Sequence, residues 1–411
     1  MLSAPVNAHV GMEVGAARRV GARGSVSAPA LGLVMGDVDV VRALGIAGIP
    51  VAFFGYPGDP ARFSRHVRVA LPWIDHWERR DELLAALLAF AASQPVPPVL
   101  FPQTDPSLLL VSRHRDELQQ GFRFALADAD LIEDLADKSR FQALAERHDL
   151  PVPRARTLRP EPGHPAPVLD LAFPLVIKPM VRSERWVSIA GAGKALHVAG
   201  ADDLAASWSR LVELEADILA QELVPGPESD IESFHAYVDE HGAIAGEFTG
   251  RKIRTFPPRY GHSTAVEVTP IPDVAELGRE VIGRLGLRGV AKADFKRDAR
   301  GRLHLLEVNP RFNLWHYPGA VAGVNLPALV YADLMGRPRP RVGPMRSAVT
   351  WCKPLQDLRA AYVVGVRPLS WLRWARRCQT LSGLAWDDPL PFVRGALWPQ
   401  LRRRVLRRAR G

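Results

Sequence analysis

The stretch ADFKRDARGRLHLLEVNPR, residues 293–311, decides the fold of the second half of the chain. It covers most of two β-type runs, Val290–Arg297 and Arg302–Val308, joined by a turn at Asp298–Gly301. Similar β-type runs precede it, with a helical pattern at Val274–Leu285 between: Pro174–Lys178, Ile218–Leu223, Ile231–Val238 and Ala243–Thr249. Strand pairs separated by helices predict an α+β domain with antiparallel sheets.

Oxygen-bearing side chains gather in this stretch. Strand alternation places Glu307 and Asn309 on one face, and Asp294 lies on the preceding strand of the same hairpin. Two carboxylates and an amide oxygen suit Mg²⁺, which keeps several waters and shares its other ligand positions with nucleotide phosphates. Arg311 follows directly and offers a planar guanidinium to a carboxylate or phosphate. An ordinary surface hairpin would show the same residues, so other segments have to support this interpretation.

Three other segments offer groups that suit a nucleotide. Lys138 opens a helix, and Lys178 ends an apolar strand, where burying an unpaired charge would be costly. Both lysines can neutralise phosphates as point charges. The segment Gln221-Glu222-Leu223-Val224 ends another strand and can present backbone N–H and C=O groups to an adenine edge. Each signal is weak alone, and their order along the chain gives them weight.

The first part of the chain alternates short apolar runs with helix patterns. The apolar runs lie at residues 30–35, 50–55 and 99–101, and the helix patterns at 37–48, 81–92 and from Ser107 onward. This alternation predicts a parallel, doubly wound sheet, here called Rossmann-like. No G-x-G-x-x-G motif follows the first strand, so we expect no dinucleotide site in this part.

Taken together, these segments resemble the ATP-grasp superfamily, and within it the carboxylate–amine ligase group that includes D-aspartate ligase. The resemblance covers roughly residues 131–335. It rests on the motifs named above, on the run from Ile177-Lys178-Pro179 to Lys194, on Gly250-Arg251-Lys252-Ile253-Arg254, and on Asn309-Pro310-Arg311 followed by Trp315-His316. The fold class implied is α/β and α+β, with a Rossmann-like N-terminal domain before an ATP-grasp fold.

The resemblance implies a role for each matching residue. ATP and Mg²⁺ are the implied cofactors, with two metal ions expected and Mn²⁺ as an alternative. Asp294, Glu307 and Asn309 would bind the metals, and Arg311, Lys252 and Arg254 would act on the reacting groups. The residues implied to hold ATP are Lys138 and Lys178 for the phosphates, Gln221, Glu222 and Val224 for adenine, and Asp230 or, failing it, Glu228 for ribose.

The implied activity is an ATP-dependent ligase that joins a carboxylate to an amine through an acyl-phosphate and releases ADP and phosphate. Its partners would be a small-molecule carboxylate and a small-molecule amine. Two alternatives stay open: an ATP-grasp enzyme with another acceptor, and a non-catalytic nucleotide-binding protein that acts through a basic tail.

The expected division of the chain follows these patterns. We predict a poorly ordered leader at 1–28, the Rossmann-like domain at 29–130 and the ATP-grasp domain at 131–336. A small lid subdomain is expected at about 150–225. A basic extension rich in Trp and Arg would occupy 337–411.

Charge and composition set the remaining expectations. The chain of 411 residues is 47% hydrophobic and has two cysteines, which excludes a disordered chain and a disulfide scaffold. Its net charge of +9 is uneven, because residues 337–411 hold 17 Lys and Arg against three acids. Six of these arginines lie between Gln400 and Gly411. The sequence predicts a cytoplasmic enzyme whose tail contacts an anionic membrane at the inner surface; nucleic acid is a less favoured partner, and a merely solvated tail is the alternative.

Overall fold

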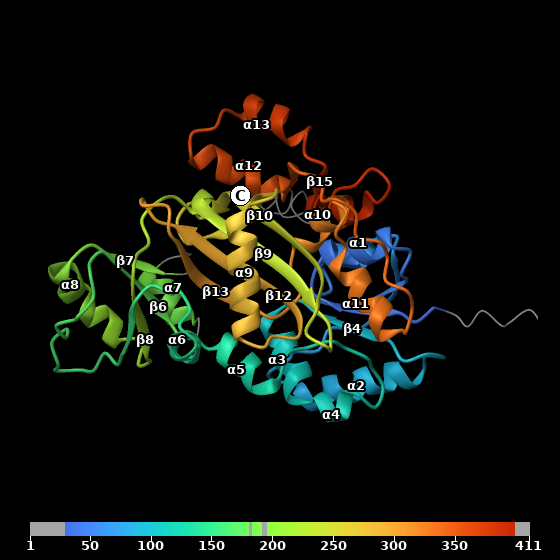
Figure 1. Ribbon diagram of the computed structural model, residues 1–411, viewed down its shortest axis with the longest axis horizontal. Helices are drawn as coiled ribbons and strands as arrows, with labels where there is room; N and C mark the ends of the chain where they lie inside the picture. Colours follow the sequence, from blue (N-terminus) through green and yellow to red (C-terminus); the bar gives the residue numbers. More distant parts are fainter. Residues whose placement is uncertain (1–28, 181–182, 191–194, 399–411) are drawn as a thin grey trace, which may run out of the picture.

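The computed structural model describes residues 29–180, 183–190 and 195–398. The leader predicted at 1–28 and the arginines between 400 and 411 therefore lie outside the described residues. Figure 1 shows three sheets: an N-terminal sheet, a small second sheet at the opposite end, and a large main sheet between them.

The N-terminal sheet is parallel, as the strand–helix alternation predicts. Its strands are β1 (Gly32–Met35), β2 (Val51–Phe54), β3 (Val67–Ala70) and β4 (Val99–Pro102), in the order β3-β2-β1-β4. Four helices accompany it: α1 (Val38–Ile46), α2 (Arg80–Ala92), α3 (Asp105–Arg113) and α4 (Arg115–Leu118). Asp37 caps α1 by accepting from the backbone N–H of Asp39. The third helix begins at Asp105, two residues before the predicted start, because Thr104 and Ser107 form a capping box.

The small second sheet lies within residues 155–222 and is antiparallel. Its strands are β5 (Ala155–Leu158), β6 (Leu175–Pro179), β7 (Leu196–Val198) and β8 (Ile218–Glu222), in the order β5-β8-β6-β7. Helices α7 (Glu184–Ala190) and α8 (Ala201–Val212) belong to this unit, and α8 buries Leu204, Trp208 and Leu211 in its core. Two helices, α5 (Ala129–Ala136) and α6 (Lys138–Arg147), precede it.

The main sheet has seven strands and carries the stretch that opened the sequence analysis. Its order is β13-β12-β9-β10-β11-β14-β15. The strands are β9 (Ile231–Val238), β10 (Ile244–Phe256), β11 (His262–Val268), β12 (Gly289–Arg297), β13 (Leu303–Asn309), β14 (Val349–Cys352) and β15 (Thr380–Leu381). The predicted hairpin is present as β12 and β13, which pair antiparallel across the Asp298–Gly301 turn.

The two faces of the main sheet have different neighbours. Helix α9 (Pro272–Arg284) covers one face, where Val281 packs with Phe234 and Phe295. The other face packs, at one end, against α10 (His316–Val321), α11 (Leu326–Leu334) and the N-terminal sheet. The remainder of this second face lies toward the small sheet and forms the floor of the cavity described below.

The sheet continues past the boundary predicted at residue 336. Strands β14 and β15 lie within the predicted extension, and β14 pairs with β11 while β15 pairs with β14. Helices α12 (Pro354–Val363) and α13 (Pro368–Ala375), and a short helical segment at Pro391–Leu397, follow. No strand is predicted here from the sequence, because β14 follows the Pro- and Arg-rich stretch 337–346 and not a helix pattern, so no strand–helix alternation marks it.

The C-terminal segment also contacts the N-terminal helix α1. Arg42, buried in α1, pairs with the buried carboxylate of Asp388 and donates to the backbone carbonyl of Leu381. Asp39, one turn earlier, accepts hydrogen bonds from Trp351 Nε1 and the Ser382 hydroxyl. Residues 351–388 therefore connect α1, the first helix that the structure describes, to the edge of the main sheet.

Candidate active site

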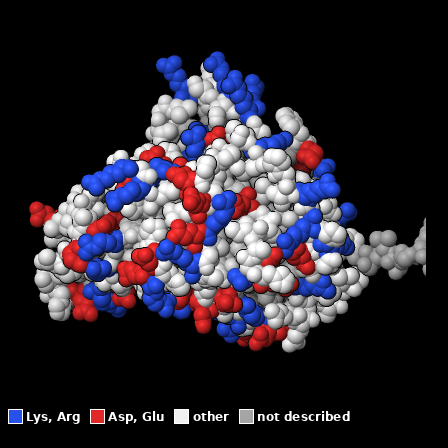
Figure 2. Space-filling view, in the orientation of Figure 1, with Lys and Arg blue, Asp and Glu red and all other residues white. Residues whose placement is uncertain are grey.

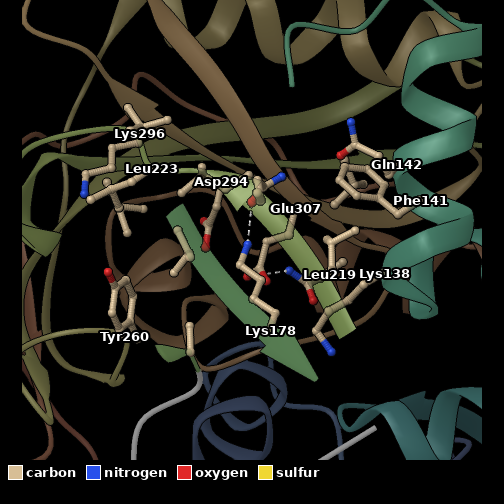
Figure 3. Close-up of a pocket in the computed structure, with 18 of the residues that line it drawn as sticks. Lys138, Phe141, Gln142, Lys178, Leu219, Leu223, Tyr260, Asp294, Lys296 and Glu307 are labelled. Carbon is tan, nitrogen blue, oxygen red and sulfur yellow. Dashed lines mark hydrogen bonds between the residues drawn. The ribbon is translucent and has the colours of Figure 1, made fainter. Parts of the chain in front are cut away.

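A cavity of about 280 Å³ lies between the main sheet and the small sheet. Figure 3 shows Lys178, Asp294 and Glu307 near its centre, between the side chains of α6 and the side where Tyr260 and Lys296 lie. Ten of the thirteen site residues predicted from the sequence line it: Lys138, Lys178, Gln221, Glu222, Val224, Glu228, Lys252, Asp294, Glu307 and Asn309. Asp230, Arg254 and Arg311 are absent from its described lining.

Pairing between β12 and β13 brings the oxygen ligands together. Asp294 lies directly opposite Glu307, and Lys292 lies opposite Asn309. Because paired residues share a face, all four side chains rise from the same face of the sheet. The register shifts after Asp294, so that Leu306 has no partner on β12 and also lines the cavity.

Asp294 is buried and surrounded by donors. Its carboxylate accepts from the Ser233 hydroxyl and from Lys292 Nζ at 2.6 Å, and Lys252 Nζ lies 3.5 Å away. Burial alone would raise the pKa of Asp294, but the two ammonium groups hold it well below its usual range. Burial likewise opposes the charge of Lys252, yet the carboxylates of Asp294 and Glu307 raise its pKa. Both groups therefore carry their charges in the cavity floor.

Arg254 does not reach the cavity, which corrects the sequence-based expectation. On β11, the neighbours Val266 and Ala265 pair with Lys252 and Arg254 respectively. Adjacent residues of a strand face opposite ways, so this extra residue in β10 turns Arg254 to the face opposite Lys252. There Arg254 forms two hydrogen bonds with the buried carboxylate of Asp357, at 2.9 and 2.6 Å. Its guanidinium also lies over the Trp374 ring.

The two predicted phosphate lysines enter from different elements. Lys178 is on β6, and its Nζ donates to Gln221 Oε1 at 2.7 Å. Lys138, the first residue of α6, donates from Nζ to the Met180 carbonyl at 3.1 Å. Asp137 caps the same helix through its side chain, which fixes the position of Lys138.

The predicted adenine segment lies at the end of β8. The side chain of Gln221 is buried and bonded to Lys178, and the side chain of Glu222 accepts from the Ala172 backbone N–H. Val224 is buried and lines the cavity. The backbone N–H groups of Glu222 and Leu223 are engaged too, with the carbonyls of Arg154 and Pro174. The candidate readers of a base are therefore the backbone C=O of Glu222 and the backbone N–H of Val224.

Of the two predicted ribose residues, Glu228 lines the cavity and Asp230 does not. Both belong to the short 3₁₀ segment Glu228–Asp230. Lys296, beside them, donates to the Gly226 carbonyl at 2.7 Å. Burial lowers the pKa of Lys296, against the attraction of Glu228 and Asp230.

Several lining residues were not predicted. Lys296 was available from the sequence, because Lys292, Asp294 and Lys296 alternate along one face of β12. The apolar lining had no such signal, since it is assembled from separate elements: Phe141 on α6, Leu219 on β8, Leu306 on β13, with Leu223, Gln142 and Tyr260. This apolar wall next to backbone groups has the character of a slot for a flat ring.

Arg311 lies at the edge of the cavity and joins it to the N-terminal sheet. Its Nε donates to Asp105, a lining residue that begins α3, and its Nη1 donates to the Gln103 carbonyl at 3.2 Å. Its Nη2 lies 3.4 Å from Asn309 Oδ1. The guanidinium therefore connects Asn309, one of the predicted metal ligands on β13, to the residues that follow β4.

The comparisons with known proteins agree on the fold. No protein-family model matches the chain. In structure, it is similar to an N5-carboxyaminoimidazole ribonucleotide synthetase bound to ADP (TM-score 0.58, 12% identity, 77% of this chain and 79% of that one). It is also similar to the L-amino acid ligase of Bacillus licheniformis (TM-score 0.56, 16% identity, 75% and 74%). The chain has the ATP-grasp fold.

The sequence of this ATP-grasp chain is similar to amino-acid ligases. It is 26% identical over 234 residues to the D-aspartate ligase of Enterococcus faecium (strain Aus0004), which covers 54% of this chain and 55% of the relative. It is 28% identical over 188 residues to the D-alanine–D-alanine ligase of Stutzerimonas stutzeri (strain A1501), covering 45% and 56%. The chain thus spans about half the length of the curated relatives that it matches.

The cavity offers a partial metal site. Among the described residues, no three His, Cys, Asp or Glu side chains converge as a metal cluster. Asp294 already accepts hydrogen bonds from Ser233 and Lys292. The Glu307 side chain lines the cavity and is 53% exposed, and its Oε1 accepts from Asn309 Nδ2 at 3.1 Å. One carboxylate and one amide fit Mg²⁺, which takes its other ligands from phosphates and water. The donor set therefore fits a nucleotide-bound Mg²⁺ better than a metal held by the protein alone.

Proposed function

We propose that this protein is an ATP-dependent ligase that joins a small-molecule carboxylate to an amine through an acyl-phosphate. The observation that carries the proposal is that Lys138, Lys178, Lys252 and Glu307 line the same cavity, with an apolar slot beside them. The similarity to D-aspartate and D-alanine–D-alanine ligases supports amide-bond formation as the reaction.

The residues divide between the two ends of a bound ATP. The base would enter the slot formed by Phe141, Leu219 and Leu306 and pair with backbone groups at the end of β8. Glu228 would accept from the ribose hydroxyls in place of Asp230, because Glu228 faces the cavity. Lys138 and Lys178 would neutralise the phosphates.

Glu307 and Asn309 would hold Mg²⁺, with Asp294 as a further ligand if its lysine contacts exchange. When bound, Mg²⁺ would spread the negative charge of the terminal phosphates. The proposal includes a second Mg²⁺ ion, and Mn²⁺ is the alternative metal.

The reaction would proceed in two displacements. A carboxylate oxygen attacks the γ-phosphorus of ATP, the bond to the β-phosphate oxygen breaks, and ADP leaves. The amine nitrogen then attacks the acyl carbon, the carbon–oxygen bond to phosphate breaks, and the nitrogen gives up a proton to the departing phosphate. Lys252 would stabilise the transferred phosphoryl group, and Arg311 would stabilise the oxyanion that forms at the acyl carbon. Water has to be excluded, because it competes with the amine for the acyl carbon.

Amine-dependent ADP release tests the proposal. D- and L-amino acids would be supplied in pairs with ATP and Mg²⁺, and both ADP and the condensed product would be measured. ADP release that requires a carboxylate and an amine, with product in equal amount, is the expected result. ADP release without any amine would favour an ATP-grasp enzyme with another acceptor, and ATP binding without turnover would favour a non-catalytic protein.

We also propose a cytoplasmic enzyme that works at the inner surface of a membrane. No described helix is both long and apolar enough to cross a bilayer. The excess of Lys and Arg beyond residue 336 supports the proposed contact with anionic lipid.

A further inference from the structure

Helices α12 and α13 form a hairpin that projects from the main sheet. In Figure 1 it stands at the top of the molecule, away from the N-terminal and small sheets. Helix α12 packs on β10 and β11, and α13 packs against α12. The tip of this hairpin, defined here as residues 362–369, lies midway along the chain between strands β14 and β15.

The tip exposes several apolar side chains, three of them on consecutive residues. Tyr362 is 72% exposed, Val363 55% and Val364 51%, and Leu369 across the turn is 70% exposed. Three consecutive exposed apolar residues are unfavourable in water unless something covers them. Leu372, one turn along α13, adds to the same apolar surface.

The charge around this apolar surface has one sign. Five arginines lie on the hairpin: Arg359, Arg367, Arg373, Arg376 and Arg377. Its single acid, Asp357, is buried. Figure 2 shows Lys and Arg side chains at the top of the molecule, where the hairpin projects. An exposed surface of arginines and apolar residues without exposed acids is suited to an anionic surface.

The hairpin is held firmly, so its exposed residues are not the result of loose packing. Asp357 accepts from Arg254, from the Thr264 hydroxyl at 2.8 Å and from Trp371 Nε1 at 2.8 Å. Trp371, Ala361 and Ala375 form a small core between the two helices. These contacts lie on the inner side of the hairpin, so the tip and the arginines stay exposed.

We propose that the α12–α13 hairpin is a membrane-docking element, with an anionic lipid bilayer as its partner. This proposal rests on the peripheral location proposed above and not on the ligase activity. A projecting tip fits a bilayer, which deforms around a convex surface, whereas a protein partner would need a matching groove. The apolar tip would enter the acyl boundary while the arginines meet lipid phosphates.

Vesicle co-sedimentation of the full chain tests the proposal. Vesicles of phosphatidylglycerol with phosphatidylcholine would be compared with phosphatidylcholine alone, at low and high salt. Two variants address the hairpin: V363S/L369S for the tip and R373Q/R377Q for the charge. The matched control is V168S/R210Q, which removes an exposed valine and an arginine of the small-sheet unit.

We expect the wild-type chain and the control to bind the anionic vesicles, less at high salt. The tip variant should lose about tenfold in partitioning and the charge variant at least about fivefold. Unchanged binding by both hairpin variants would overturn the proposal and leave the terminal arginines as the contact. Binding indifferent to lipid charge, or a preference for RNA over vesicles, would also overturn it.

A fluorescent probe separates tip insertion from attachment through the C-terminal residues. An environment-sensitive dye on V364C should shift to shorter wavelength on anionic vesicles, and the same dye on V168C should not. The unsubstituted chain controls for labelling of Cys378, which is partly exposed. Equal spectra for the two labelled positions would show that the tip stays in water. ATP-dependent turnover, measured without lipid, should be the same in all these variants, so failure of this proposal is distinguishable from failure of the ligase proposal.

Discussion

Lys252 and Arg254 lie two positions apart on β10 but point to opposite faces of the main sheet. Regular alternation would put them on one face, and the extra residue in β10 separates them. Lys252 faces Asp294 in the cavity, while Arg254 pairs with Asp357 at the base of the α12–α13 hairpin. One strand therefore carries both a residue proposed to act on the transferred phosphoryl group and a residue that anchors the C-terminal helices.

Substitution of these two residues by Met should separate activity from stability. Lys252→Met should reduce ADP release by about a hundredfold, because the transferred phosphoryl group loses a cation. Arg254→Met should leave the rate per folded molecule near wild type. It should lower the free energy of unfolding by about 3 kcal/mol, because Asp357 stays buried without its cation. Turnover and denaturant unfolding check this, and loss of turnover in a stable Arg254→Met protein would return Arg254 to the reaction.

Glu307→Gln should abolish Mg²⁺-dependent ADP release while the protein stays folded. The substitution keeps the shape but removes the charge that the metal requires, and a loss of about a hundredfold or more is expected. Thermal unfolding should change little, because the side chain is half-exposed. The measurement is ADP release across a Mg²⁺ titration, and wild-type release at saturating Mg²⁺ would remove Glu307 from the metal site.

Lys178→Met should weaken ATP binding with little loss of stability. The methionine keeps an unbranched side chain and removes the phosphate partner. Gln221 loses the donor of its 2.7 Å hydrogen bond, which should cost about 1 kcal/mol. Calorimetric titration with ATP gives the affinity. Val187→Ser, an exposed position on α7, is a control that should bind ATP as wild type does.

The sequence predicts the strands that carry a strong local pattern. The β12–β13 hairpin and β9 lie within a residue of their expected bounds, because runs of β-type residues mark them. Helix α6 begins at Lys138, as expected, and Asp137 caps it. Strand β14 is not among the predicted strands: it follows the Pro- and Arg-rich stretch 337–346 and not a helix pattern, and its partner β11 lies far earlier in the chain, at His262–Val268. The continuation of the main sheet past residue 336 follows from that long-range pairing.

In the candidate site, too, local sequence patterns predict some residues, whereas long-range contacts decide others. Asp294, Glu307 and Asn309 could be placed together because alternation along two neighbouring strands is a local property. The outward turn of Arg254 depends on a register shift against β11, which one strand's sequence does not encode. The apolar slot likewise depends on α6, β8 and β13 meeting in space.

Asp39 should make stability depend on pH. Burial, with the nearby Asp37 carboxylate, raises the pKa of Asp39 to about 7, against the hydrogen bonds from Trp351 and Ser382 and the charge of Arg42. The pKa in the unfolded chain is near 3.8. Because the folded state favours the protonated carboxyl, this contribution to stability is fully present below about pH 4 and is lost as pH rises through about 7.

Asp39→Asn should remove that contribution, because an amide does not titrate. The free energy of unfolding of the wild type should fall relative to Asp39→Asn by up to about 1.4 kcal/mol per pH unit between pH 4 and 7. The amide oxygen can still accept from Trp351, so the variant should fold. Urea unfolding across this range measures the difference, and Asp387→Asn, an exposed acid paired with Arg65, is the control that should keep the wild-type slope. Parallel pH profiles for wild type and Asp39→Asn would mean that Asp39 is ionised in the folded protein, held by Arg42 and its two hydrogen-bond donors.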